Sequence, residues 1–274
     1  MNKIKKVIIP LAGYGSSLFP ATMFIPKALT PIGNQPCIQY IIRECLDAGI
    51  KKFIFVISPE QDLIVKYLSK TEVSKLVKKF PEHKELARYK AMLEQIESLD
   101  FVIQRQRKGL GHAIYSARNL IEDEDFAVIL GDNPIINTPD NYCGTGIKEL
   151  SDLYEKNNLY YVGLKEVNPL NISKYGIATL EEDKMIKTLI EKPQKAESNL
   201  AIAGRYILPS KIFDYIKEYM NDYKGQKEYD LTYPLNEMAF SEMNLYGHNM
   251  NSEILDMGKT DVYSSYAWIK SRVL

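Results

Sequence analysis

Two glycines that follow the first apolar run of the chain could bind phosphate through their backbone amides. Gly13 and Gly15 stand in residues 11–20, directly after the apolar residues 7–9. Glycines let a backbone approach a ligand closely and expose amide hydrogens to phosphate oxygens. The dinucleotide and P-loop patterns are absent, since Pro20 stands where a helix should continue and no Gly-Lys-Ser/Thr follows. On this segment alone, a nucleotide cradle and a simple tight turn both stay open.

Polar residues elsewhere in the chain are also of types that bind nucleotides. Lys27 lies between Pro26 and Pro31, which stiffen its loop, so it is either a solvated lysine or a cation for a triphosphate. Gln104 follows the apolar residues 101–103 and can present its amide to a nucleobase, or it simply ends a surface strand. The segment then enters a helix through Gly109, where His112 is expected to be structural.

Two aspartates end apolar runs. Asp132 follows residues 126–130, and Asp256 follows Ile254 and Leu255. A carboxylate at the end of a buried strand is costly without a partner, and magnesium is the usual partner beside phosphates. The pair can hold one Mg²⁺, although each aspartate is also a candidate helix cap or turn residue.

The elements that must position these residues alternate along the chain. Short apolar runs predict strands at residues 7–9, 53–57, 101–103, 126–130 and 160–164. Helical spacing predicts helices at residues 38–46, 113–120 and near 147–154, with two or three more in residues 60–97. This alternation indicates a mostly parallel sheet covered on both faces. Ligands of such sheets bind beyond the carboxyl ends of the strands, where the polar residues above stand.

The pattern changes after residue 165. Residues 177–180 and 185–190 predict paired strands, residues 201–208 a further strand, and residues 210–220, 231–241 and 261–274 helices. The chain contains no Pro/Gly/Ser-rich linker and no internal repeat. We therefore expect one domain over residues 1–274, with an elaboration from about residue 166 onward.

Composition excludes several classes of protein. The 274 residues carry a formal net charge of zero, which argues against nucleic-acid and membrane-surface binding. Cys37, Cys45 and Cys143 form no CxxC pair, as expected for a reduced cytoplasmic protein. No apolar run approaches the length of a membrane span. We expect a cytoplasmic protein that acts on a small molecule.

Together these motifs resemble the bacterial UTP–glucose-1-phosphate uridylyltransferases, from about residue 6 to residue 266. The resemblance implies a Rossmann-like mixed, mostly parallel sheet flanked by helices, as in glycosyltransferase-A-like nucleotidyltransferases. The segments that carry it are Ile9-Pro10-Leu11-Ala12-Gly13-Tyr14-Gly15, Phe19-Pro20-Ala21-Thr22, Ile25-Pro26-Lys27, Pro36-Cys37-Ile38-Gln39-Tyr40, Lys108-Gly109-Leu110-Gly111-His112-Ala113, Lys174-Tyr175-Gly176, Glu191-Lys192-Pro193, Ser198-Asn199-Leu200-Ala201 and Gly204-Arg205-Tyr206.

The resemblance implies that UTP and glucose 1-phosphate give UDP-glucose and pyrophosphate, by in-line attack at the α-phosphorus with Mg²⁺. No general base is needed, because the sugar phosphate is already a nucleophile at neutral pH. By analogy, the site residues are Ala12, Gly13, Gln104 and Gly109 for uracil, Gly15 for the nucleotide, Lys27 for the triphosphate, Asp132 and Asp256 for Mg²⁺, Gly176 and Glu191 for the sugar hydroxyls, and Lys192 for the sugar phosphate. The same analogy implies a homodimer or homotetramer.

Three departures from the family pattern fall in one region. Ser17 stands for the arginine of Gly-Thr-Arg, Met23 for a lysine, and Ala28 for the glutamate of Pro-Lys-Glu. Losing one preorganised charge from such a site costs about 2.7–4 kcal/mol in activation free energy. Arg105 or Arg107 can compensate. Two alternatives stay open: the same reaction with another nucleotide or hexose phosphate, and a weakened homologue that binds UDP-sugar in a regulatory role.

Overall fold

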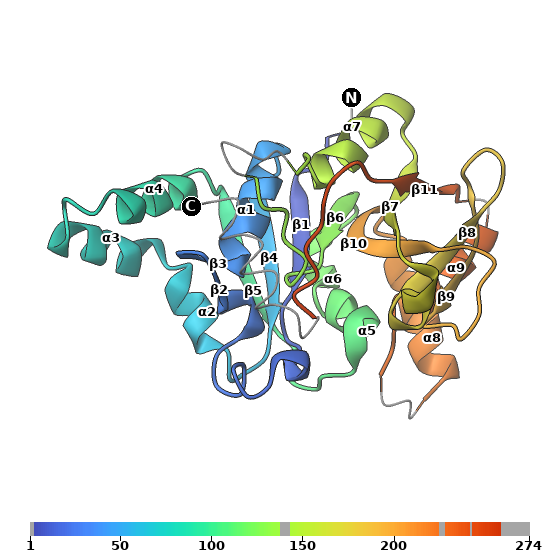
Figure 1. Ribbon diagram of the computed structural model, residues 1–274, viewed down its shortest axis with the longest axis horizontal. Coiled ribbons are helices and arrows are strands. Elements are labelled where there is room, and N and C mark those ends of the chain that lie inside the picture. The colour runs from blue at the N-terminus through green and yellow to red at the C-terminus, as the bar shows by residue number, and fades with distance from the viewer. Residues whose placement is uncertain (1–2, 138–142, 225–227, 242, 259–274) are drawn as a thin grey trace.

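The computed structural model describes residues 3–137, 143–224, 228–241 and 243–258. In these ranges the chain builds a nine-stranded sheet with helices on both faces (Figure 1). The seven strands of its main path follow the order β11-β7-β10-β6-β1-β4-β5, and β8 pairs with β10 and β9. Their bounds are β1 Lys6–Pro10, β4 Lys52–Ile57, β5 Ser98–Ile103, β6 Phe126–Ile129, β7 Tyr160–Glu166, β8 Gly176–Leu180, β9 Ile186–Glu191, β10 Leu200–Leu208 and β11 Leu245–Asn249.

The N-terminal part of the sheet is entirely parallel. Strand β1 pairs in parallel with β4 and β6, and β4 pairs in parallel with β5. The C-terminal strand β10 then runs antiparallel between β6 and β7, while β11 pairs with β7 in parallel. The strands that follow residue 166 therefore extend the same sheet. The expected mixed, mostly parallel sheet flanked by helices is confirmed.

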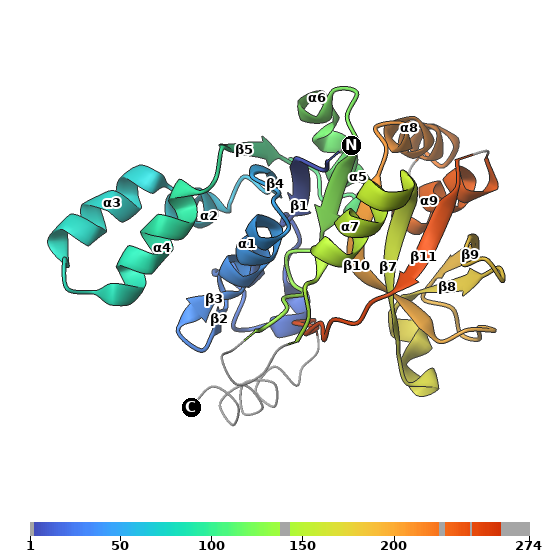
Figure 2. The same cartoon turned by 90° about the horizontal axis from the view of Figure 1, so that it is seen from above.

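Alternating side chains of the strands divide the core into two layers. Val7 and Ile9 pack on one face of β1, together with side chains of α1 and α7, while Ile8 packs on the other face. Helices α5, α6, α8 and α9 cover that second face, and Figure 2 shows the sheet between the two helical layers. The helices are α1 Cys37–Asp47, α2 Asp62–Tyr67, α3 Lys70–Lys79, α4 Lys84–Glu94, α5 Gly109–Ser116, α6 Arg118–Ile121, α7 Ile147–Asn157, α8 Ile212–Asp222 and α9 Thr232–Phe240.

Most predicted elements are present, with three differences. The segment predicted as one helix over 113–120 forms the two helices α5 and α6. The small hairpin of β2 (Pro31–Ile32) and β3 (Gln35–Pro36) and the edge strand β11 were not predicted. The residues predicted as a final helix, 261–274, lie outside the described residues. No helix in the described ranges is both long and apolar enough to cross a membrane.

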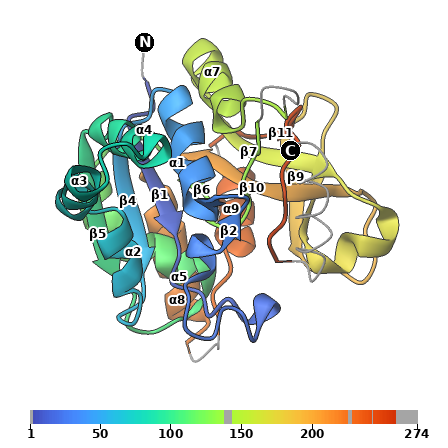
Figure 3. The same cartoon turned by 60° about the vertical axis from the view of Figure 1, so that its left-hand side comes forward.

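The region predicted to hold two or three helices contains three. Helices α3 and α4 pack against each other and project beyond the edge strand β5 at the left of Figure 1, and Figure 3 brings this pair of helices forward. Their inner faces join the core through Val73, Tyr89 and Leu93. In Figure 1 this pair of helices lies away from β1 and β6, the strands whose carboxyl ends carry the predicted site residues.

Candidate active site

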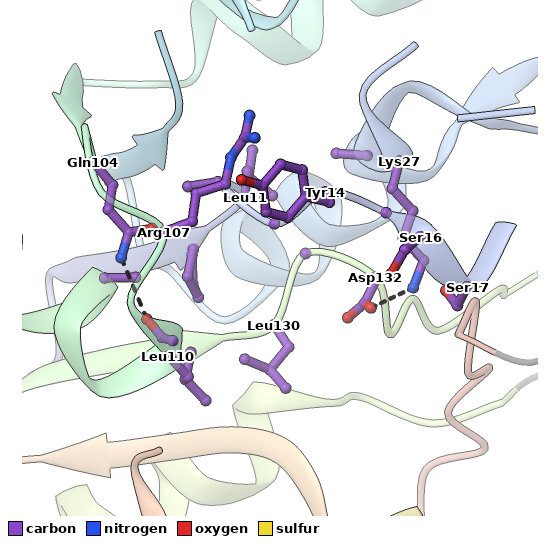
Figure 4. Close-up of a pocket in the computed structure, with 18 of the residues that line it drawn as sticks. Leu11, Tyr14, Ser16, Ser17, Lys27, Gln104, Arg107, Leu110, Leu130 and Asp132 are labelled. Carbon is purple, nitrogen blue, oxygen red and sulfur yellow. Dashed lines mark hydrogen bonds and ion pairs between the residues drawn. The ribbon is translucent and has the colours of Figure 1, made fainter. Parts of the chain in front are cut away.

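A cavity of about 400 Å³ lies where the loops behind β1, β5 and β6 meet (Figure 4). The three strands are parallel, so their carboxyl ends reach the same edge of the sheet. The residues expected at the nucleotide and present in its lining are Ala12, Gly13, Gly15, Lys27, Gln104, Gly109 and Asp132. The four remaining expected residues, Gly176, Glu191, Lys192 and Asp256, do not line this cavity.

Gly15 gives the glycine loop a tight left-handed turn. Gly15 has φ +69° and ψ +20°, a left-handed conformation that favours glycine, and a 3-10 helix at Ser16–Leu18 follows it. A Cβ at Gly15 would also lie 3.3 Å from the Cβ of Lys27. Among the described residues, the amides of residues 13–17 find no hydrogen-bond acceptor. Unpaired amides that line a cavity are available to phosphate oxygens.

Gln104 lies in a fixed orientation at one end of the cavity, opposite Lys27 and Asp132 in Figure 4. Its side chain is 3% exposed, and its Nε2 donates to the Gly109 carbonyl oxygen at 3.3 Å and lies 2.8 Å from His112 Nδ1. Burial, with a smaller contribution from Lys108, lowers the pKa of His112, so the neutral ring can accept this hydrogen bond. His112 therefore orients the Gln104 amide.

Gly109 brings a later segment to this end of the cavity. It has φ +88°, and a Cβ there would lie 2.5 Å from the carbonyl oxygen of Tyr229. The Tyr229 amide donates to the Lys108 carbonyl oxygen, and the Gly111 amide donates to that of Tyr229. Only a glycine permits this close backbone approach, so Gly109 shapes the wall beside Gln104.

An ion pair occupies the other end of the cavity. Lys27 Nζ donates to Asp132 Oδ2 at 2.7 Å, and both side chains are visible in Figure 4. Asp256 reaches the same place from the C-terminal segment, because the Met257 amide donates to the Asp132 carbonyl oxygen. A Cβ at Gly258 would lie 2.9 Å from Asp256 Oδ1 and 3.6 Å from Lys27 Nζ. The two aspartates thus lie on adjoining segments, 124 residues apart in the sequence.

The donor set at this end suits a hard divalent cation. Within the described ranges, no cluster of three or more His, Cys, Asp or Glu side chains is placed to hold a metal ion. The two carboxylates of Asp132 and Asp256 therefore provide an incomplete protein site. Magnesium commonly binds one or two carboxylates together with substrate phosphates and water, so these residues fit it once phosphate is present.

The residues expected at the sugar lie together, at the start of β8, the end of β9 and the position after it. Gly176 pairs with Glu191 across β8 and β9, and a Cβ at Gly176 would lie 3.2 Å from Glu191 Oε2. Lys192 Nζ lies 3.2 Å from Glu191 Oε1, and its side chain is 62% exposed. Thr232 donates its hydroxyl to Glu191 Oε2 at 3.0 Å. Sequence reasoning missed Thr232, because only the folded chain brings it to Glu191.

Tyr14 and Tyr175, to which the sequence analysis gave no role, line or border the site. Tyr14 and Arg107 line the cavity, and the guanidinium carbon of Arg107 lies 3.9 Å from the centre of the Tyr14 ring. Tyr175 donates its hydroxyl to Asp256 Oδ2 at 3.1 Å and so links the sugar side to the aspartates. Tyr14 and Tyr175 both belong to segments that carry the family resemblance, and this was the only sign in the sequence that they could border the site.

The three residues that depart from the family pattern lie in different environments. Ser17 lines the cavity without charge, whereas Met23 is exposed and lies outside the lining. Ala28 lines the cavity and is buried against the core layer that contains α1. Arg105 is exposed and does not line the cavity, so of the two arginines considered as substitutes only Arg107 is positioned at the site.

A buried ion pair supports the loop that carries Asp132. The side chains of Arg205 and Glu44 are 0% and 4% exposed, and Arg205 donates to Glu44 Oε2 at 2.8 Å. Arg205 also donates to the Asn133 carbonyl oxygen, while Glu44 Oε1 accepts from the Ile147 amide at 2.8 Å. The pair thus fixes the backbone directly behind Asp132.

Comparisons with known proteins identify the family of this chain. Residues 6–268 match the family described as nucleotidyl transferase. The chain is 35% identical to a UTP–glucose-1-phosphate uridylyltransferase of Staphylococcus saprophyticus and 34% identical to that of Bacillus subtilis, each over 94% of this chain and 89% and 88% of the relative. A crystal structure of UDP-glucose pyrophosphorylase complexed with UDP-glucose superposes with a TM-score of 0.84 at 33% identity, over 98% of this chain and 100% of the other. The chain belongs to the nucleotidyl transferase family, in the group of the UTP–glucose-1-phosphate uridylyltransferases.

Proposed function

We propose that this chain forms UDP-glucose and pyrophosphate from UTP and glucose 1-phosphate. The observation that carries the proposal is the content of one cavity. Free amides of residues 13–17, the fixed amide of Gln104 and the pair of Lys27 with Asp132 all face it. A base-binding end and a phosphate-binding end in one space suit a nucleoside triphosphate.

The nucleotide would lie along this cavity. Uracil would contact Ala12, Gly13, Gln104 and Gly109, which surround the end where the Gln104 amide is held. The phosphates would reach the Gly15 turn, and Lys27 would carry the counter-charge. A buried amide discriminates bases by the pairing of its donor and acceptor groups, which supports a role for Gln104 in choosing uracil.

Glucose 1-phosphate would bind beside β8 and β9. Glu191 would accept hydrogen bonds from sugar hydroxyls, with Gly176 leaving room next to it. Lys192 is exposed and bound only to its neighbour Glu191 among the described ion pairs, so its ammonium can turn to the sugar phosphate. Tyr175 would hold Asp256 between the two substrates.

The reaction then needs positioning and charge neutralisation. A phosphate oxygen of the sugar attacks the α-phosphorus, and the bond to the oxygen that bridges to the β-phosphorus breaks as pyrophosphate leaves. No proton has to be removed, because the attacking phosphate is already ionised. Lys27 and Lys192 hold the two anions close together. Mg²⁺ on Asp132 and Asp256 would supply further neutralising charge when bound.

We also propose an oligomeric state and a cellular location for the protein. We expect a homodimer or homotetramer in the cytoplasm. Sedimentation of the purified chain across a range of concentrations tests the first expectation, and a constant monomer mass would contradict it.

Pyrophosphate release tests the function. The purified chain is supplied with Mg²⁺, UTP and glucose 1-phosphate, and other triphosphates and hexose phosphates are compared in parallel. Fastest turnover with UTP and glucose 1-phosphate supports the proposal, whereas faster turnover with another pair shows a different substrate.

A second function is favoured by Ser17 and Met23, where the family pattern has cations. This is a homologue that binds UDP-sugar in a regulatory role. Measurable UDP-glucose binding without turnover of any substrate pair would support it over the enzyme.

A further inference from the structure

We propose that Arg107 is a phosphate-binding residue of the nucleotide site, where it takes the place of the cation that Ser17 does not provide. The inference rests on the proposed function and adds a residue that the family pattern does not assign. Its ligand would be the β- and γ-phosphates of the triphosphate, which leave together as pyrophosphate.

The charge of the cavity motivates this role. Its charged lining residues are Lys27, Arg107, Asp132 and Glu228, so the described lining has no net charge. Lys27 is bound to Asp132 within the cavity. The partner of Arg107, Glu60, lies outside the lining. Arg107 is therefore the cation of the described lining that a triphosphate can engage without uncovering a carboxylate inside the site.

The position of Arg107 also fits. Its guanidinium stacks on Tyr14, which lies between the glycines of the cradle, with the ring centre 3.9 Å away. In Figure 4, Tyr14 lies between Arg107 and Lys27. Tyr14 is thus flanked by two cations from different loops. Stacking on an aromatic ring leaves the edge of a guanidinium free for the bidentate contacts with phosphate that arginine favours.

The present contacts of Arg107 are easily exchanged. Its Nη2 donates to Ser58 Oγ at 2.8 Å and to Glu60 Oε2 at 2.7 Å. Glu60 is 69% exposed, and an ion pair to such a carboxylate contributes little to stability. Arg107 Nε is buried without a hydrogen-bond partner in the described structure. A phosphate that replaces Glu60 would offer this guanidinium more acceptors than it now has.

Arg105 provides a matched control. It stands on the same loop with the same charge, yet it is exposed and lies outside the cavity lining. We would measure binding of UTP and UMP to the full chain with Mg²⁺ by titration calorimetry, for wild type, Arg107→Met and Arg105→Met. Arg107→Met should weaken UTP binding by about 10- to 100-fold and UMP binding much less, because UMP lacks the leaving phosphates. Arg105→Met should change neither.

A rescue variant separates charge from packing. Adding Ser17→Arg to Arg107→Met should restore the preference for UTP over UMP, since the loop then regains a cation. Unchanged UTP binding in Arg107→Met, equal losses for UTP and UMP, or failure of the rescue in a folded double variant would each overturn the inference. These outcomes leave the proposed function intact, whereas a wild-type chain that binds neither UTP nor UDP-glucose would overturn the proposed function itself.

Discussion

Lys27 Nζ lies 2.7 Å from Asp132 Oδ2 and so neutralises a carboxylate that we propose as a metal ligand. The lysine side chain is the more deeply buried of the two. A cation already bound to a carboxylate repels a second cation, so metal binding and nucleotide binding should be coupled. If the phosphates of a bound nucleotide draw Lys27 away, Asp132 should become available to the metal ion.

Replacing this lysine tests the coupling. Without nucleotide, Lys27→Met should bind Mn²⁺, used as a paramagnetic substitute for Mg²⁺, more tightly than wild type does. With both substrates, the variant should turn over about 10²–10³-fold more slowly, because one preorganised charge is lost. Electron paramagnetic resonance measures free Mn²⁺ in the first experiment, and Asp132→Asn serves as the control that should bind it weakly. Mn²⁺ binding that is no tighter in Lys27→Met would contradict the competition.

Asp256 should matter as much as Asp132. Asp132→Ala and Asp256→Ala should each abolish metal-dependent pyrophosphate release, and near-normal turnover in either variant would contradict its metal role. Tyr175→Phe removes only the hydroxyl that donates to Asp256, so turnover should fall by roughly 10-fold. Tyr160→Phe is the matched control, because its hydroxyl bonds Asp125 instead.

The sequence predicted the parts of the fold that depend on local patterns. Strands β1, β4 and β6 are buried apolar runs, and such runs are recognisable without knowledge of their neighbours. Strand β11 was missed because Gly247, His248 and Asn249 have little strand propensity, and the strand exists through its pairing with β7.

In the site too, the sequence predicted residues that belong to local motifs but not the contacts that folding creates between distant segments. Residues in short motifs, such as Gly15, Gln104 and Lys27, were predicted and line one cavity. The bond from Tyr175 to Asp256 joins residues 81 positions apart, and the stack of Arg107 on Tyr14 joins two different loops. Such contacts depend on how the sheet brings strand ends together. One sequence contains no signal for them.

The pair of Arg205 and Glu44 should be a main determinant of stability. Glu44→Gln leaves the buried guanidinium without its counter-charge, so the free energy of unfolding should fall by about 3–5 kcal/mol. Denaturant unfolding measures this, with Asp214→Asn in the exposed Lys211 pair as a control that should change little. A loss in Glu44→Gln no larger than in the control would show that water or a neighbour compensates.

Glu149 should make the stability of the fold sensitive to acid. Burial alone would raise the pKa of its carboxyl group, but hydrogen bonds from His248, Ser252 and the Asn251 amide outweigh burial and lower the pKa. A carboxyl group with a lower pKa in the folded state stabilises the protein above its unfolded pKa of about 4.3, and this stabilisation is lost as the pH falls through the folded value. Glu149→Gln should therefore be less stable than wild type at pH 7, and the difference should shrink below about pH 4.3. Unfolding free energies across that range measure the effect, and a difference that stays constant with pH would contradict it.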